Sequence, residues 1–216
     1  MKKIGLLIIG LTITFFANGQ VVKLQGGTSF STLDWKLNSI DFKIFDKTLI
    51  GYSIFVGIDY FDKQYFNLSS NIGMVRKGGK GNVPLTDFGG NIITERTENA
   101  LLDYLSINTT MDFKYPIKET ISPFISFGPR FDYLLRSSNF FDILSEFDAL
   151  KSSSIGLILG GGLKYDISNL QFGLRADYYL DFSNKVAEWT IDDTGINGQA
   201  LVNTFTINLS VGYRLK

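Results

Sequence analysis

The sequence has 216 residues, carries 21 basic and 21 acidic side chains, and contains neither cysteine nor histidine. The lack of cysteine excludes disulfides, thiolate chemistry and a lipoprotein anchor. The lack of histidine removes the most frequent general base and zinc ligand, which argues against an enzyme. The balanced charge offers no basic surface, so we expect no nucleic-acid partner.

The first 19 residues have the features of a secretory signal peptide. Lys2 and Lys3 precede an apolar run over residues 4–16, and small residues follow at Ala17 and Gly19. The run is too short for a transmembrane helix, which needs about 20 apolar residues. We therefore expect cleavage after Gly19 and one domain over residues 20–216. Loss of the two lysines leaves 19 basic against 21 acidic groups.

Eight later segments alternate apolar and polar residues. From Phe205 to Leu215, for example, every odd position is apolar and every even position is polar, charged or small. This period of two is typical of a strand with one apolar and one polar face. Pro129 interrupts one segment and predicts a bulge or bend, because proline cannot donate a ladder hydrogen bond. The predicted strands are 22–30, 51–61, 66–77, 101–115, 123–136, 154–165, 170–181 and 205–215.

The connections between these strands alternate in length. Short turns on one rim and long loops on the other are typical of outer-membrane barrels. We therefore predict an all-β, eight-stranded antiparallel up-and-down transmembrane β-barrel with short periplasmic turns, long extracellular loops and both termini on the periplasmic side. The long connections are 31–50, 77–100, 137–152 and 183–202, and the short ones are 62–64, 116–122 and 166–169.

A soluble barrel such as a lipocalin is the competing interpretation, with its apolar face inward. Two features favour a membrane barrel over a soluble one. Aromatic residues cluster near the ends of the apolar faces, such as Tyr52 and Tyr60 or Phe205 and Tyr213, as membrane interfaces favour. The polar faces carry charges and glycines, which do not form a dry ligand pocket. Outer-membrane lipid is then the main partner.

Several strand segments resemble a known family. They are Leu101 to Ile107, Pro123 to Arg130 with the following Tyr133 to Leu135, Gly160 to Tyr165, and the ending Val211 to Arg214. Together they resemble the Bacteroidetes-type outer membrane β-barrel domain family, which includes PorT-like proteins. The resemblance covers essentially the whole mature chain and implies the fold and the location. For PorT-like members it further implies an association with a secretion system and gliding.

The polar faces bring opposite charges into the predicted lumen. Eight strands enclose an interior just wide enough for side chains, so these groups predict an ion-paired plug. A narrow pore or a proton path is the alternative. The same faces also carry Lys23 and Asp181. The predicted lumen residues are Asp59, Asp112, Arg130, Asp132, Lys164, Arg175, Asp177 and Arg214.

The predicted long loops carry apolar residues. Five of them, from Phe140 to Leu150, have the spacing of a helical stripe. They form either a cap over the barrel mouth or a contact surface for a protein partner. The residues concerned are Trp35, Phe140, Ile143, Leu144, Phe147, Leu150 and Trp189.

Three short motifs have simpler interpretations than their chemical ones. Asp193-Thr194-Gly195 occurs once, whereas aspartic proteases pair two such loops, so it predicts a turn. Residues 77–82 lack the end of a phosphate loop and predict a flexible loop tip. The three glycines at 160–162 lie within a strand pattern. We expect no cofactor and no metal site.

The sequence thus predicts a monomeric, non-enzymatic outer-membrane barrel that is structural or binds a partner through its extracellular loops. Two alternatives remain. A narrow pore or a secretion-associated, PorT-like barrel is the first. An outer-membrane lipid-modifying enzyme is the second, with serine, aspartate or tyrosine in place of histidine.

Overall fold

The computed structural model describes residues 20–38, 40–42, 45, 47–86, 89, 92–117, 120–142, 149–182, 185–191 and 196–215. The predicted signal peptide lies outside these residues, as do Ile143, Leu144, Phe147 and the motif at 193–195. No helix in the described residues is long and apolar enough to cross a membrane.

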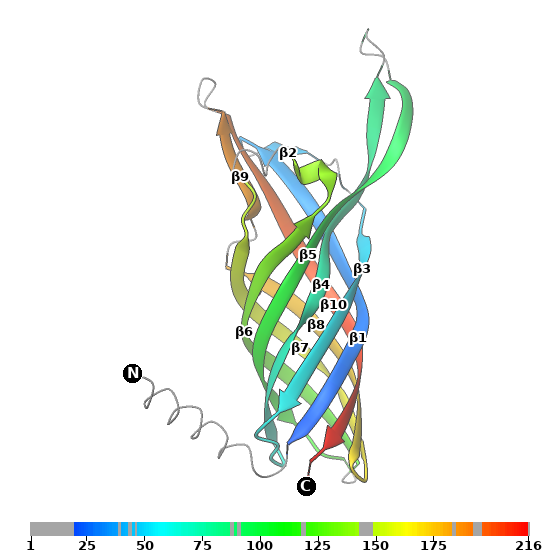
Figure 1. The fold of residues 1–216 in the computed structure, drawn as a ribbon, viewed down its shortest axis with the longest axis vertical. Coiled ribbons are helices and arrows are strands. Elements are labelled where there is room, and N and C mark those ends of the chain that lie inside the picture. The colour runs from blue at the N-terminus through cyan, green and yellow to red at the C-terminus, as the bar shows by residue number, and fades with distance from the viewer. Residues whose placement is uncertain are drawn as a thin grey trace, which may run out of the picture.

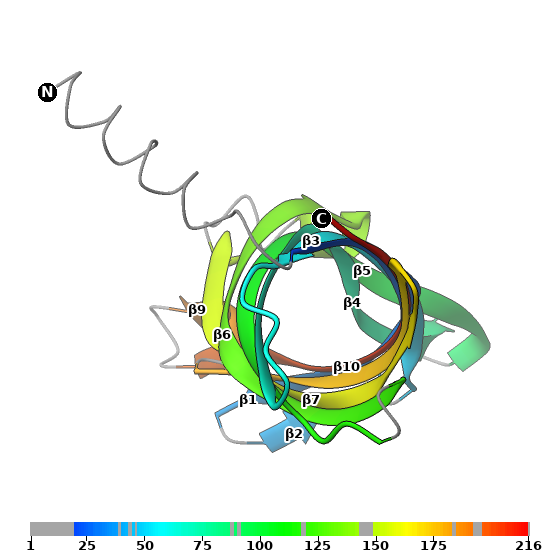
Figure 2. The ribbon, with the colours of Figure 1, turned by 90° about the horizontal axis from the view of Figure 1, so that it is seen from below.

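The described chain is built of strands, apart from one turn of 3₁₀ helix. All strands belong to one antiparallel sheet, and β1 also pairs with β10, which closes the sheet into a barrel (Figures 1 and 2). The elements are β1 (Val21–Leu37), β2 (Ile40–Phe42), β3 (Leu49–Asp59), β4 (Phe66–Thr86), β5 (Ile92–Lys114), β6 (Ile121–Ser137), η1 (Asn139–Phe141), β7 (Ser153–Ile167), β8 (Leu170–Asp181), β9 (Lys185–Ile191) and β10 (Ile196–Arg214).

Two of the strands are short continuations of others. β2 pairs with β1 beyond the end of β3, and β9 pairs with β10 beyond the end of β8. The ten described strands therefore occupy eight positions around the barrel. This confirms the predicted eight-stranded, antiparallel, up-and-down barrel.

The two rims differ as predicted. The β3–β4, β5–β6 and β7–β8 connections are short and share one rim, here called the short-turn rim. The barrel begins and ends at this rim, because Val21 pairs with Asp59 at the end of β3 and the Leu215 amide donates to the Gln20 carbonyl at 2.8 Å. At the opposite, distal rim, the hairpin of β4 and β5 extends beyond the other strands (Figure 1).

This hairpin corrects the prediction for residues 77–100, which was a long loop. β4 and β5 stay in one register from the Phe66–Phe113 pair to the Leu85–Thr94 pair. Residues 77–82, predicted as a loop tip, lie within β4, and Lys77 is only 2% exposed. The glycines there are needed for packing, because a Cβ on Gly79 would lie 2.5 Å from the Leu33 side chain.

Of the bulge or bend predicted at Pro129, the bulge is wrong. The β5–β6 ladder omits the Thr109–Pro129 and Thr110–Gly128 pairs, yet it has the same register on either side of this gap. The register shift lies further along, between Asp103 and Tyr104 of β5. Leu135 is the extra residue on β6, and it leaves Arg136 exposed although the alternation placed that residue inward.

The polarity of the two faces reverses along the barrel axis. Toward the short-turn rim the outer face is apolar, with Leu209 67% and Ile125 69% exposed, while the interior is polar. Toward the distal rim the interior is apolar, with Leu33 and Leu102 buried, and the outer face carries charges such as Asp34. Because apolar groups avoid water, the two parts suit two different surroundings.

Gly78 allows a test of the packing at the point where the β4–β5 hairpin leaves the barrel wall. Its φ of +140° is rarely adopted by other residues, and a Cβ there would lie 1.8 Å from the Ala100 carbonyl. We expect Gly78→Ala to lower the unfolding free energy by about 1–3 kcal/mol and to expose residues 79–100 to limited proteolysis. Gly26→Ala is the control, because its Cβ would meet nothing within 4 Å. Equal effects of the two substitutions would contradict this role for Gly78.

Candidate functional site: the filled lumen and its cap

The interior nearest the short-turn rim holds a chain of ion pairs, here called the lower ionic layer. Lys23 Nζ lies 2.6 Å from Asp59 Oδ1, and Lys164 Nζ bridges Asp59 Oδ2 at 3.1 Å and Asp112 Oδ2 at 3.0 Å. Arg175 continues the chain from Asp112. Cations and anions alternate, so each charge has an opposite neighbour.

Arg175 joins two carboxylates of this layer. Its Nη1 lies 3.3 Å from Asp112 Oδ1, and its Nε lies 2.7 Å from Asp177 Oδ2. Its Nη2 also donates to Ser126 Oγ at 2.9 Å. With Lys23, Lys164 and Asp59, the lower ionic layer contains three cations and three anions. Its formal charge is therefore zero.

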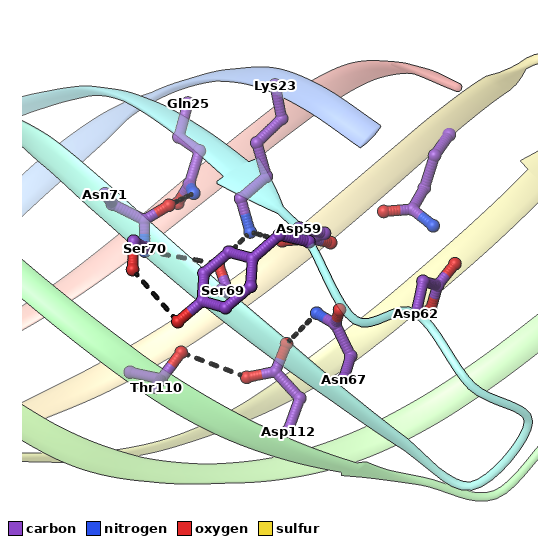
Figure 3. Close-up of polar contacts among 12 residues, drawn as sticks. Lys23, Gln25, Asp59, Asp62, Asn67, Ser69, Ser70, Asn71, Thr110 and Asp112 are labelled. Carbon is purple, nitrogen blue, oxygen red and sulfur yellow. Dashed lines mark hydrogen bonds and ion pairs between the residues drawn. The ribbon is translucent and has the colours of Figure 1, made fainter. Parts of the chain in front are cut away.

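Neutral polar side chains complete the hydrogen bonds of the lower ionic layer. Ser69 Oγ accepts from Lys23 Nζ at 2.6 Å, and Asn67 Nδ2 donates to Asp112 Oδ2 at 3.2 Å (Figure 3). Above them Gln25 Nε2 donates to Asn71 Oδ1 at 2.7 Å. Buried polar groups with partners cost far less free energy than unpaired ones. Polar side chains therefore fill this part of the lumen.

A second cluster, the upper ionic layer, lies closer to the distal rim. Lys77 is paired with Asp132, and Arg130 is paired with Asp181. Arg130 Nε also lies 3.2 Å from Asp132 Oδ2, and the guanidinium carbon lies 4.2 Å from the centre of the Tyr179 ring. Two cations again balance two anions. Arg130 Nη1 and Asp132 Oδ1 have no hydrogen-bond partner among the described residues, so this layer is less completely satisfied.

A third group of charges closes the short-turn rim. Arg214 Nη2 lies 3.1 Å from Asp62 Oδ2 and 3.0 Å from Asp166 Oδ1, and Lys114 also pairs with Asp62. The Arg214 side chain is 37% exposed. Arg214 was predicted as a lumen residue, and its position at the strand end places it at the rim instead.

The structure places the other predicted lumen residues in two separate layers. Five belong to the lower ionic layer, whereas Arg130 and Asp132 belong to the upper one. Lys77 was missed, because residues from 77 onward were assigned to a loop. The sequence did contain a pattern that predicts its inward position, because Lys77 continues the inward alternation of Asn71, Gly73 and Val75 along β4.

Aromatic side chains cover the upper ionic layer at the distal rim. The Trp35 ring centre lies 5.5 Å from that of Phe140 and 5.2 Å from that of Trp189. The ring centre of Phe45 lies 4.7 Å from that of Phe140, and Phe141 is fully buried. We call these five residues the aromatic cap. Phe45 and Phe141 were not among the predicted loop residues.

The aromatic cap is continuous with the apolar interior of the distal barrel. Trp35, Trp189 and Leu150 pack against a buried cluster that includes Leu33 and Val202. Of the predicted loop residues, four are described, and all four lie in or beside this packed region. Phe140 is the most exposed of them, at 38%. The packing matches the cap interpretation better than an open contact surface.

The described residues contain no group of three or more acidic, histidine or cysteine side chains that could hold a metal ion. The carboxylates of the two ionic layers are already engaged by lysine and arginine.

The sequence matches no protein-family model and no curated protein at a significant level. Among solved structures, it is similar to the outer membrane protein OprG from Pseudomonas aeruginosa, with a TM-score of 0.54, 11% identity, and coverage of 91% of this chain and 96% of that one. The chain has the fold of an outer-membrane barrel. At this identity the likeness shows the fold alone.

Two further solved structures have lower scores. Neisserial surface protein A gives a TM-score of 0.48 with 12% identity and covers 90% of this chain and 97% of its own. The outer membrane protease OmpT from Escherichia coli gives a TM-score of 0.45 with 7% identity, and the match covers 92% of this chain and 97% of that one.

Arg175 is the clearest test of the lower ionic layer. Arg175→Met leaves Asp112 and Asp177 buried without this cation, so we expect a loss of about 3–5 kcal/mol in unfolding free energy. The midpoint of the heat-induced shift in gel mobility would report it. Lys151→Met is the control, because its 3.6 Å pair with Glu188 is exposed and worth about 0–1 kcal/mol. An unchanged midpoint for Arg175→Met would contradict the layer's structural role.

The aromatic cap can be followed by fluorescence, because Trp35 and Trp189 are the two tryptophans of the sequence. A Cβ on Gly198 would lie 2.0 Å from the Trp189 ring. We therefore expect Gly198→Ala to displace that ring and to shift tryptophan emission to longer wavelength. Gly26→Ala should leave the emission unchanged. A Gly198→Ala spectrum identical to that of the original protein would show that Trp189 is not held against β10.

Proposed function

We propose that this protein is a monomeric, non-enzymatic barrel of the outer membrane, exported by a cleaved signal peptide. The apolar outer face supports this. Side chains such as Leu24, Ile54, Ile125 and Leu209 are more than half exposed. Monomeric soluble proteins rarely expose apolar surface on this scale, and lipid removes its contact with water.

The orientation follows from the reversal of polarity. The short-turn rim lies in the periplasm, and the distal rim, where the outer face becomes charged, lies outside the cell. Aromatic residues border the apolar band, as membrane interfaces favour. Tyr115 and Tyr213 lie near the short-turn rim, and Tyr133 and Tyr178 lie farther along their strands, all of them exposed.

The observation that carries the functional part of the proposal is the filled lumen. Asp59, Asp112 and Asp132 have no exposed surface, and Arg130 is 1% exposed. A water-filled path would have to separate these pairs, and breaking a buried pair costs about 3–5 kcal/mol. This supports an ion-paired plug over a narrow pore.

A closed lumen leaves the distal rim as the working part of the molecule. The rim combines a packed aromatic cap with a long projecting hairpin, so it can stabilise the envelope or present a rigid surface to a protein partner. A secretion-associated role, as the resemblance to PorT-like proteins implies, would use the same rim. The lipid-modifying alternative has less support, because the carboxylates of the upper ionic layer are all paired.

Conductance in a planar bilayer tests the closed lumen. Barrels refolded into vesicles and fused with the bilayer should show no stepwise conductance, because no ion path avoids the two ionic layers. A wide-lumen porin in the same membrane serves as the positive control. Insertion is checked separately by the heat-induced shift in gel mobility. Steady conductance from correctly inserted barrels would favour the narrow pore instead.

A further inference from the structure

Along the outer part of β5, one backbone edge has no strand partner among the described residues. β6 leaves β5 at Leu101, whose amide donates to Ser138 Oγ at 3.0 Å and whose carbonyl accepts from the Ser138 amide at 2.9 Å. Beyond that point, β4 is the one strand that pairs with β5 in the described chain. We call residues 93–100 of this strand the β5 edge.

The other edge of the same hairpin is partly covered. Lys47 and Lys80 exchange two backbone hydrogen bonds, at 2.9 and 3.1 Å. The β5 edge is therefore the more open of the two, and it lies on the element that projects farthest at the distal rim (Figure 1). Exposed strand edges are templates for pairing with another chain.

From Thr94 to Asn99 the side chains of the β5 edge are polar and carry a short charge pattern, whereas Ile93 is apolar and 69% exposed. Arg96 Nε lies 2.9 Å from Glu98 Oε1 on one face of the hairpin, and these side chains are 71% and 39% exposed. On the other face, Asn82 Nδ2 donates to Glu95 Oε2 at 3.0 Å, and Thr97 Oγ1 donates to Asn82 Oδ1 at 3.1 Å. Both faces are thus ordered by their own contacts.

We infer that the β5 edge pairs with the β5 edge of a second copy in an antiparallel, two-fold arrangement. This rests on the proposed outer-membrane location. In such a pair, residues from the same face lie opposite each other. A register centred on Thr97 places Arg96 opposite Glu98 of the second copy, twice. It also places the Glu95 carboxylate of each copy opposite the Asn99 side-chain amide of the other.

The neighbouring two-fold registers are less favourable. Centring the pair on Arg96 places two arginines opposite each other, and centring it on Glu95 or on Glu98 places two glutamates opposite each other. Centring it on Asn99 brings no opposite charges together and places Thr97 opposite Leu101, whose backbone is already bonded to Ser138. Like charges directly opposite each other destabilise a strand pair, whereas opposite charges stabilise it. The charge pattern of Glu95, Arg96 and Glu98 therefore selects the register centred on Thr97.

The direction of the strands determines where the second copy lies. Paired antiparallel strands run in opposite directions, and each hairpin points away from its own membrane. The two barrels therefore lie in facing membranes rather than side by side in one membrane. One edge of eight residues is a small contact, so single pairs are weak and become effective only when many copies link two surfaces. The protein stays monomeric within its own membrane.

Clustering of vesicles that carry the refolded full-length mature chain tests this pairing. Vesicles with the original sequence should cluster, as followed by turbidity. Arg96→Glu places a carboxylate opposite Glu98 of the other copy at both symmetry-related positions. Clustering should therefore slow by about tenfold or more. Glu98→Arg should act in the same way. The double variant Arg96→Glu/Glu98→Arg restores opposite charges and should restore clustering.

Controls separate this inference from the proposed function. Lys151→Glu reverses an exposed charge away from the β5 edge and should cluster normally. Correctly inserted, non-conducting barrels that do not cluster, or an Arg96→Glu variant that clusters fully, would overturn the pairing and leave the proposed function intact. A folded double variant that fails to cluster would also overturn it. Failure to insert, or steady conductance, would contradict the proposed function instead.

Discussion

Pairing of buried charges in the lumen is the constraint on which the barrel depends. A charge removed from water is stable only beside an opposite charge, so each inward carboxylate requires a cation from another strand. Lys164 on β7 reaches Asp59 on β3 and Asp112 on β5, which links strands across the barrel as well as around it. A slip of one residue in any strand would turn these groups outward, so the ion pairs and the strand registers specify each other.

The distal half is stabilised by a different force. Beyond the upper ionic layer its interior is apolar, so hydrophobic packing takes over from ion pairing there. The aromatic cap lies on this packed interior and depends on glycine where rings approach the backbone, as at Gly198 beneath Trp189. One chain thus combines the inside-out arrangement suited to lipid with the ordinary arrangement suited to water, and the change occurs within single continuous strands.

Local alternation was enough to predict the eight wall positions and the inward faces, because the period of two reports directly which side chains share a face. It did not predict where strands end. Residues 77–100, the outer part of the β4–β5 hairpin, were assigned to a loop, since their glycines and polar residues lack an apolar face and their pairing depends on a distant partner strand. The alternation assigned Arg214 to the inward face of its strand. Because Arg214 lies at the end of β10, its side chain reaches the short-turn rim rather than the lumen. The contacts of Phe45 and Phe141 in the aromatic cap depend on chain segments far apart in sequence, which no local pattern reveals.

The unequal lengths of the strands have a consequence for access to the cell surface. β5 has 23 residues, whereas β3 has 11. At about 3.3 Å per residue β5 spans about 75 Å, and a membrane-crossing strand needs only about 9–11 residues. In the proposed outer-membrane location, more than half of β5 would therefore stand clear of the hydrocarbon layer. Under a dense coat of surface sugars, the shorter strand ends would be screened, and the outer part of the β4–β5 hairpin would be the first described part of the protein that an approaching cell, phage or antibody meets.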